Sequence, residues 1–120
     1  MAKIAAVDDA PEVLKLISGI LEPAGHEVIA LRDGDGLEER IEADRVHLVL
    51  LDVVLPGRDG YQILRNLKRN EATRRVPVVL ISSKTEPTDL EWGRMQGADD
   101  YLTKPFTAED LLERVQRLAT

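Results

Sequence analysis

Five short apolar segments, separated by amphipathic stretches, constrain the fold of this chain more than any other feature of its sequence. The third and fourth segments, His-Leu-Val-Leu-Leu and Pro-Val-Val-Leu-Ile, are apolar without alternation. Uninterrupted apolar strands are typical of a parallel sheet that is covered by helices on both faces. The sequence therefore predicts five buried parallel strands, at residues Lys3–Val7, Glu27–Leu31, 47–51, 77–81 and 99–102.

The stretches between the predicted strands carry apolar residues at the spacing of a helix. One stripe consists of Val13, Leu14, Ile17, Ile20 and Leu21, another of Ile63, Leu64 and Leu67, and a third of Leu111, Leu112, Val115 and Leu118. Residues 37–44 and 87–96 are the two remaining predicted helices. A strand followed by a helix, repeated five times, predicts one doubly wound α/β domain that spans residues 1–120.

The composition excludes several classes of function. With 16 basic and 22 acidic side chains the net charge is −6, which argues against a protein that binds nucleic acid or an anionic membrane by charge. Aromatic residues make up 3% of the chain, too few for a platform on which bases stack. The chain has no cysteine, so disulfides, thiolate zinc sites and cysteine nucleophiles are excluded.

The apolar segments are also far shorter than the about 20 residues that a membrane-spanning helix requires. The first residues, Met-Ala-Lys-Ile, lack the apolar stretch of a signal peptide. We therefore expect a cytoplasmic protein without a segment that inserts into a membrane.

Polar side chains that can bind a ligand or take part in a reaction follow four of the five predicted strands. In an open parallel sheet, ligands bind outside the carboxyl ends of the strands. The second strand is followed by Arg32 and Asp33, which we expect to lie away from such a site. The other four are followed by Asp8 and Asp9, by Asp52, by Ser82 and Ser83, and by Thr103, Lys104 and Pro105. We expect three carboxylates, hydroxyl groups and a lysine to meet at one edge of the sheet.

Three carboxylates at one edge repel one another strongly unless a cation lies between them. Carboxylate oxygens without histidine or cysteine ligands favour Mg²⁺, with Mn²⁺ as an alternative. A lysine supplies a compact positive charge for an anionic oxygen, and a serine hydroxyl can donate a hydrogen bond to the same group. A carboxylate nucleophile with these neighbours is suited to phosphoryl transfer.

Each of these residues also has a plainer interpretation. A single aspartate after a strand is usually a turn former or a helix cap. Lys104 can be a solvated loop residue, and Ser82 can be a capping hydroxyl. The coincidence of suitable residues at four of the five strand ends favours the functional interpretation.

Four motifs carry a resemblance to a known family. They are Ala-Val-Asp8-Asp9, Leu-Leu-Asp52-Val-Val-Leu-Pro56-Gly-Arg-Asp-Gly60, Val-Leu-Ile-Ser82-Ser83 and Tyr101-Leu-Thr-Lys104-Pro105-Phe106. In this order and spacing they resemble the receiver domain of bacterial two-component response regulators, over the whole chain. The segment from Leu90 to Pro105 also resembles the single-domain regulators of type IV pilus twitching motility. The resemblance implies a flavodoxin-like fold with strand order 2-1-3-4-5.

The resemblance implies a role for each residue of these motifs. Asp52 is the expected phosphoacceptor, and a histidine kinase or a phosphotransfer domain is the expected donor. Asp9, Asp52 and the backbone carbonyl of Val54 would hold Mg²⁺, and Asp8 would assist through a water molecule. The phosphoryl group would be bound by Lys104 and by the hydroxyls of Ser82 and Ser83.

The resemblance also implies how the signal leaves the domain. Ser82 and Tyr101 would change position after phosphorylation, and the Lys104–Pro105 bond is a candidate cis peptide. The changed surface, formed by residues 85–97, 99–102 and 107–119, would bind an output protein. Such a chain is a phosphorylated switch and not a turnover enzyme, and we expect a monomer or a weak dimer.

Several side chains fall outside these roles. Val54 cannot hydrogen-bond an attacking water, so we predict a long-lived phosphorylated state. Lys84 is either solvated or pairs with a carboxylate of a partner, and Trp92 either anchors the core or contacts a partner. His26 and His47 lie in or beside predicted strands, and we interpret them as packed or edge histidines.

Two other functions compete with the switch. A phosphatase of the haloacid dehalogenase type uses similar groups, but it carries a second aspartate two residues after the nucleophile, where this chain has Val54. It also requires a cap, for which 120 residues leave no room. The other alternative is a receiver fold that binds partners without being phosphorylated, and the complete set of site residues disfavours it.

Overall fold

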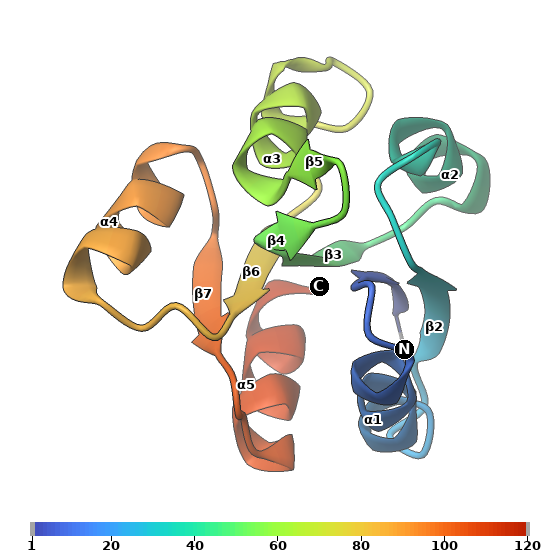
Figure 1. Ribbon diagram of the computed structural model, residues 1–120. Coiled ribbons are helices and arrows are strands. Elements are labelled where there is room, and N and C mark those ends of the chain that lie inside the picture. The colour runs from blue at the N-terminus through green and yellow to red at the C-terminus, as the bar shows by residue number, and fades with distance from the viewer. Residues whose placement is uncertain (1, 120) are drawn as a thin grey trace.

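A five-stranded parallel sheet forms the centre of the computed structural model, which describes residues 2–119 (Figure 1). The strands lie in the order β2-β1-β3-β6-β7, which is the predicted order 2-1-3-4-5 when only the parallel strands are numbered. The flavodoxin-like fold predicted from the sequence is therefore confirmed. The strands are β1 (Lys3–Val7), β2 (Glu27–Leu31), β3 (Leu48–Asp52), β6 (Val78–Ser82) and β7 (Asp100–Thr103).

The last three parallel strands begin and end one residue later than the sequence predicts. Asp52 pairs with Ile81 in the parallel ladder, and the backbone N–H of Val53 donates to the Ile81 carbonyl. Ladder hydrogen bonds join backbone groups, so they continue past the point where the side chains become polar. Asp52 and Ser82 are consequently the last residues of their strands, where the pairing holds their backbone in place.

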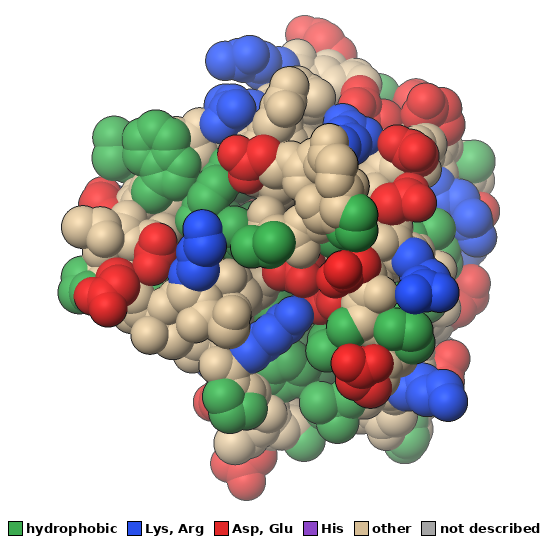
Figure 2. Space-filling view, viewed as in Figure 1, with side chains coloured by type: hydrophobic (Ala, Val, Ile, Leu, Met, Phe, Trp, Pro, Cys, Tyr) green, Lys and Arg blue, Asp and Glu red, His purple; other side chains and the backbone are tan. Residues whose placement is uncertain are grey.

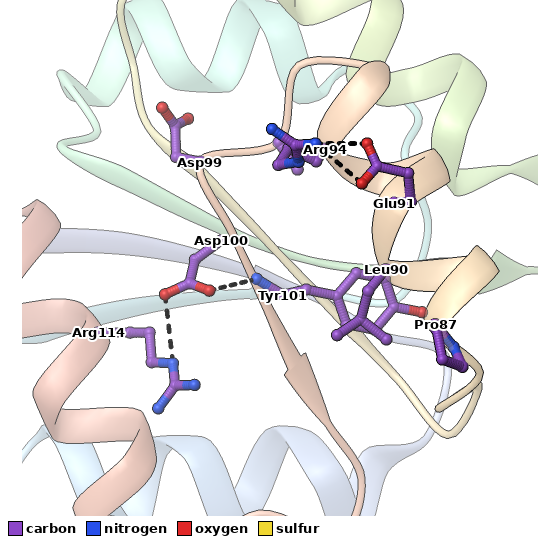
Figure 3. A pocket seen from close by; sticks show the side chains of 9 residues that line it. Pro87, Leu90, Glu91, Arg94, Asp99, Asp100, Tyr101 and Arg114 are labelled. Atoms are coloured by element: carbon purple, nitrogen blue, oxygen red, sulfur yellow. Dashed lines mark hydrogen bonds and ion pairs between the residues drawn. The ribbon is translucent and has the colours of Figure 1, made fainter.

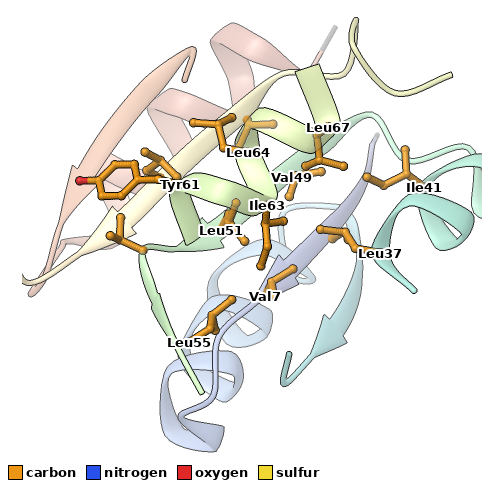
Figure 4. Close-up of a cluster of buried hydrophobic side chains, with 14 of the residues drawn as sticks. Val7, Leu37, Ile41, Val49, Leu51, Leu55, Tyr61, Ile63, Leu64 and Leu67 are labelled. Carbon is orange, nitrogen blue, oxygen red and sulfur yellow. The ribbon is translucent and has the colours of Figure 1, made fainter. Parts of the chain in front are cut away.

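Five helices cover the two faces of the sheet (Figure 1). Helices α1 and α5 lie on one face, and α2, α3 and α4 lie on the other. Neighbouring strand residues point to opposite faces, so Ile4 and Ala6 pack under α1 and α5, whereas Ala5 and Val7 pack under α2 and α3 (Figure 4). The helices are α1 (Pro11–Leu21), α2 (Leu37–Asp44), α3 (Gly60–Arg69), α4 (Pro87–Met95) and α5 (Ala108–Leu118).

Helix α4 has the fewest buried residues of the five. Gly93 is its one buried residue, and a Cβ at this position would meet Leu80 at 2.9 Å and Tyr101 at 3.1 Å. The missing side chain thus lets the helix approach the sheet closely. The large apolar residues of α4, Leu90, Trp92 and Met95, remain exposed.

A short antiparallel hairpin connects β3 to α3. Its strands are β4 (Val54–Leu55) and β5 (Arg58–Asp59), and Gly57 adopts a left-handed conformation with φ of +70° at the turn. The hairpin returns the chain to the end of β3, where the N–H of Gly60 donates to the Val53 carbonyl at 2.8 Å. The first turn of α3 therefore rests directly on the end of β3.

Within residues 2–119, every helix is too short or too polar to cross a membrane.

Candidate functional site

Three aspartates meet at the carboxyl edge of the sheet. One carboxylate oxygen from each of Asp8, Asp9 and Asp52 lies within 4.8 Å of the others. They meet because β1 and β3 pair in parallel with Val7 opposite Leu51, which brings the residues after Val7 beside Asp52. Asp8 and Asp52 are buried, and Asp9 is exposed. Figure 2 shows this acidic group in the middle of the face, with a basic side chain beside it.

The lysine that the sequence places after the last strand completes this cluster. Its Nζ donates to Asp8 Oδ2 at 2.8 Å and to Asp52 Oδ2 at 3.4 Å. The backbone N–H of Lys104 donates to the Ser82 carbonyl, which extends the pairing of β6 with β7 up to the lysine. The Lys104–Pro105 peptide bond is cis. Residues 8, 52 and 104 are thus brought together by three different strands.

The ionisable groups of the cluster perturb one another. Burial raises the pKa of the Asp52 carboxyl above its ordinary value, and the nearby charge of Asp8 adds to the rise. The hydrogen bond from the Val54 N–H and the charge of Lys104 act in the opposite direction. For Lys104, burial alone would lower the pKa, but the hydrogen bond to Asp8 and the two carboxylate charges raise it. The lysine is therefore held in its charged form.

Backbone hydrogen bonds fix the two buried carboxylates. Asp8 Oδ1 accepts from the N–H of Ala10 at 2.9 Å, and Asp52 Oδ1 accepts from the N–H of Val54 at 3.2 Å. Val54 itself is 58% exposed. Each carboxylate thus keeps one oxygen toward Lys104 and the other toward its own loop.

Ser82 and Tyr101 are linked through the backbone of one residue. The Ser82 hydroxyl is buried and accepts from the N–H of Lys84 at 3.1 Å. The Tyr101 ring is buried, and its hydroxyl donates to the carbonyl of the same Lys84 at 3.1 Å. Ser83, in contrast, is exposed. Of the two predicted serines, only Ser82 is enclosed at the end of β6.

Arg32 lies closer to the carboxylate cluster than the sequence indicates. Its Nη2 donates to the carbonyl of Asp9 at 3.3 Å, and both residues line a hollow of about 470 Å³ with Asp33 and Arg58. The reason is the register, because Val7 of β1 pairs with Leu31 of β2 and the two following loops start side by side. Arg32 therefore borders the cluster, although it is not part of it.

The two histidines lie just before strand starts, with His26 half-buried and His47 exposed, which agrees with the prediction of packed or edge histidines. Nδ1 of His26 accepts from the N–H of Ala2 at 3.2 Å, and Nδ1 of His47 accepts from the N–H of Lys3 at 2.9 Å. Both rings therefore lie at the amino end of β1, whereas the carboxylates lie at its carboxyl end. Burial lowers the pKa of His26 below its ordinary value, which favours the neutral ring.

Tyr61 is a residue of this region that the sequence analysis does not single out. It follows Gly60 directly, its ring is buried, and its hydroxyl donates to the carbonyl of Asp89 on α4 at 3.5 Å. The half-exposed Trp92 packs edge-on against it, with ring centroids 6.3 Å apart. Its position directly after the Asp-Gly pair is the sequence feature that could have identified Tyr61 as part of this region. Trp92 is therefore neither a buried core anchor nor free of internal contacts.

The donor set of the cluster fits a hard divalent cation. All three residues offer carboxylate oxygens, and histidine and cysteine are absent from the group. Their three negative charges face one lysine, so two charges remain to be balanced. Oxygen ligands with this charge suit Mg²⁺ or Mn²⁺.

The fold and this cluster define the class of protein. The chain belongs to the response regulator receiver domain family, whose sequence model matches residues 4–116. Receiver domains are the phosphorylation-dependent switches of two-component regulators. Protein PilH of Pseudomonas aeruginosa is 37% identical over 115 residues, which cover 96% of this chain and 95% of PilH.

Longer regulators match the chain over about half of their own length. The transcriptional regulator RpaA of a Synechocystis strain is 38% identical, with 98% of this chain and 49% of RpaA covered. The phosphate regulon regulator PhoB of Escherichia coli is 34% identical, with 95% of this chain and 50% of PhoB covered. The shared part is therefore the receiver domain.

Solved structures agree with this assignment. The chemotaxis protein CheY4 of Vibrio cholerae superposes with a TM-score of 0.90 at 30% identity, over 98% of both chains. The BeF3-activated receiver domain of Klebsiella pneumoniae RstA superposes with a TM-score of 0.88 at 34% identity, over 98% of this chain and 97% of that one.

Proposed function

We propose that residues 1–120 act as one phosphorylation-activated switch, in which Asp52 accepts a phosphoryl group from a histidine kinase or a phosphotransfer domain. The observation that carries the proposal is the position of Asp52 at the edge of the sheet. Its carboxylate lies close to that of Asp8 and forms an ion pair with Lys104. A carboxylate oxygen of Asp52 forms a bond to phosphorus while the bond from phosphorus to the donor histidine breaks. The donor imidazole takes up a proton and leaves as a neutral ring.

Asp9, Asp52 and the backbone carbonyl of Val54 would hold Mg²⁺, and Asp8 would contribute through a water molecule. Mn²⁺ has the same preference for oxygen ligands and can take its place. When bound, the cation supplies positive charge for the phosphoryl oxygens. The exposure of Asp9, beside two buried carboxylates, leaves a path by which a hydrated ion enters.

The remaining groups of the site would bind the phosphoryl group. Lys104 already lies 3.4 Å from Asp52 Oδ2, so its charge is in place for a phosphoryl oxygen. Ser82 would donate a hydrogen bond from its hydroxyl to a second oxygen, and its movement toward that oxygen would lengthen the hydrogen bond that it accepts from the Lys84 N–H. Ser83 is proposed as a further hydroxyl donor, which requires the exposed loop to turn inward.

The output surface is proposed to lie beside β7, at the sheet edge between α4 and α5. This surface, the α4-β7-α5 face, contains a hollow of about 530 Å³ that the Tyr101 ring lines (Figure 3). Movement of Ser82 would change the Lys84 backbone that also holds Tyr101, and so reshape the hollow. Phosphorylation then shifts an existing equilibrium between two conformations.

The partner at this face is proposed to be an output protein and not nucleic acid. The similarity to PilH favours a regulator of pilus-driven motility, and we propose that the domain acts in the cytoplasm as a monomer or weak dimer. We expect no turnover of phosphate monoesters, because the position two residues after Asp52 is Val54, which cannot serve as a general acid.

The proposal is tested by incubating the protein with phosphoramidate and Mg²⁺ and measuring its intact mass. We expect the gain of one phosphoryl group, because a small donor replaces the kinase when the receiver itself provides the catalytic groups. The gain should vanish when a chelator removes Mg²⁺. A protein whose mass stays unchanged under the first condition contradicts the proposal.

Binding of the cation alone should stabilise the fold. At a Mg²⁺ concentration about five times the dissociation constant, the free energy of unfolding should rise by about 1 kcal/mol, which shifts the melting temperature by several degrees. Asp9→Asn removes one exposed ligand without disturbing the core and should abolish most of this shift. Differential scanning fluorimetry with and without MgCl₂ measures it, and an equal shift in both proteins would remove Asp9 from the ligand set.

Val54 is predicted to prolong the phosphorylated state. Its exposed side chain stands beside the acceptor but offers no hydrogen bond to an attacking water. Val54→Asn supplies such a group, and one added hydrogen bond should speed dephosphorylation about fivefold. Val54→Leu, which is equally apolar, should lose phosphate at the rate of the parent. Intact mass measured over time follows the loss of the aspartyl phosphate. Equal rates of loss in the parent, Val54→Asn and Val54→Leu would contradict the hypothesis.

A further inference from the structure

The side chains of three residues line one groove on the side of α4 that faces the β4-β5 hairpin. Val54, Lys84 and Trp92 are distant in sequence, but all three border a hollow of about 660 Å³. Its lining shares no residue with the hollow of the α4-β7-α5 face. The groove is therefore a separate surface, with α4 as the wall between the two.

The floor of this groove is apolar and accessible. Val54 is 58% exposed, and Trp92 is 48% exposed. Trp92 uses only its edge contact with Tyr61, at an interplanar angle of 77°, so much of its ring is left for another contact. An exposed tryptophan next to an exposed aliphatic side chain is typical of a binding surface.

One positively charged side chain at the groove forms no ion pair within the described residues. Asp59 and Asp89 also line it, but each carboxylate accepts a backbone N–H at the start of a helix, from Tyr61 at 3.0 Å and from Glu86 at 3.2 Å. Arg58 pairs with Asp35, which belongs to a different hollow. Among residues 2–119, the lysines that form ion pairs are Lys68 and Lys104, so the exposed Lys84 ammonium is unpaired.

We propose that this groove is a second docking surface, for a protein segment that presents an apolar side chain to Val54 and Trp92 and a carboxylate to the Lys84 ammonium. The unpaired Lys84 ammonium beside exposed apolar side chains favours a carboxylate-bearing segment over a purely apolar one. The groove lies next to the phosphoacceptor, because the Val54 N–H donates to Asp52 Oδ1. The docking itself does not depend on phosphorylation of Asp52.

Two capped, alanine-based helical peptides test the proposal. One carries a leucine and a glutamate four residues apart, and the other has glutamine in place of the glutamate. Each is titrated into the full chain without Mg²⁺ or phosphodonor, while backbone amide shifts map the contact. Since Trp92 is the single tryptophan of the chain, its fluorescence reports occupancy independently. The result is thus separate from the outcome of any phosphorylation experiment.

We expect the glutamate peptide to shift the amides of residues 54, 84 and 92 and to bind about fivefold more tightly than the glutamine peptide, as for one exposed ion pair. Lys84→Gln should make the two affinities equal. Lys15→Gln, on the opposite face of the sheet, should change neither. Equal affinities in the parent, shifts confined to the α4-β7-α5 face, or binding of neither peptide would each overturn the proposal.

Discussion

The Asp52→Asn protein is expected to take up no phosphoryl group from phosphoramidate and Mg²⁺, whereas the parent takes up one. Asparagine has the size of aspartate and can still accept the Val54 N–H, but its amide cannot form an acyl phosphate. Intact mass spectrometry after incubation measures the difference. The loss should be complete, because the substitution removes the nucleophile itself.

A matched control separates loss of the nucleophile from loss of local charge. Asp33→Asn removes an acid from the neighbouring hollow. The Asp33 side chain accepts a hydrogen bond from the Asp35 N–H, which the amide oxygen of asparagine can accept equally well. We expect this protein to be phosphorylated as the parent is. Uptake by Asp52→Asn at the parental level would instead mean that another residue is the acceptor.

The Asp52→Asn protein should also be at least as stable as the parent at neutral pH. Burial, with the charge of Asp8, raises the pKa of Asp52 above its ordinary value of 3.8. An acid with a raised pKa in the folded state destabilises the fold as the pH increases from the unfolded value, and the penalty is complete once the pH exceeds the folded-state pKa. Asparagine carries no such penalty. Unfolding by denaturant, measured on both proteins, therefore distinguishes lost chemistry from misfolding.

Replacing Gly60 by alanine is expected to lower the free energy of unfolding by about 3 kcal/mol, the upper end of the usual cost of overpacking. A Cβ at this position would lie 2.4 Å from the Asp52 carbonyl oxygen and 2.6 Å from that of Val53. Both neighbours are backbone atoms of the strand end, so they cannot move aside as a flexible side chain can. Either α3 or the phosphoacceptor loop must shift, and urea denaturation measures the cost.

Gly19→Ala provides the matched control. Gly19 lies inside α1, and no atom lies within 4 Å of a Cβ built there. Because alanine favours a helix over glycine, this substitution should raise the free energy of unfolding by about 0.5–1 kcal/mol. If the free energy of unfolding of Gly60→Ala lies within about 0.5 kcal/mol of that of the parent, the prediction is wrong, and the end of β3 accommodates the added Cβ without destabilising the fold.

Much of the fold is predictable from local patterns. Uninterrupted apolar runs predict Leu48–Asp52 and Val78–Ser82 as buried parallel strands to within one residue. Helices cover both faces of the sheet, so the side chains on both sides of these strands are apolar. The residue types at the strand ends likewise predict an acidic cluster, since parallel strands end at one edge. The cis bond before Pro105 and the strand order come from the resemblance and not from these patterns.

The sequence by itself thus determined the strands, the helices and the chemical types that gather at the carboxyl edge, because burial and periodicity are local properties of the chain. Only the tertiary structure decided which atoms meet. The register of β1 with β2 brings Arg32 to Asp9, and the close approach of α4 at Gly93 leaves Trp92 in one groove with Val54 and Lys84. These contacts join residues distant along the chain, and their geometry depends on how strands pair and helices pack, which local patterns do not specify.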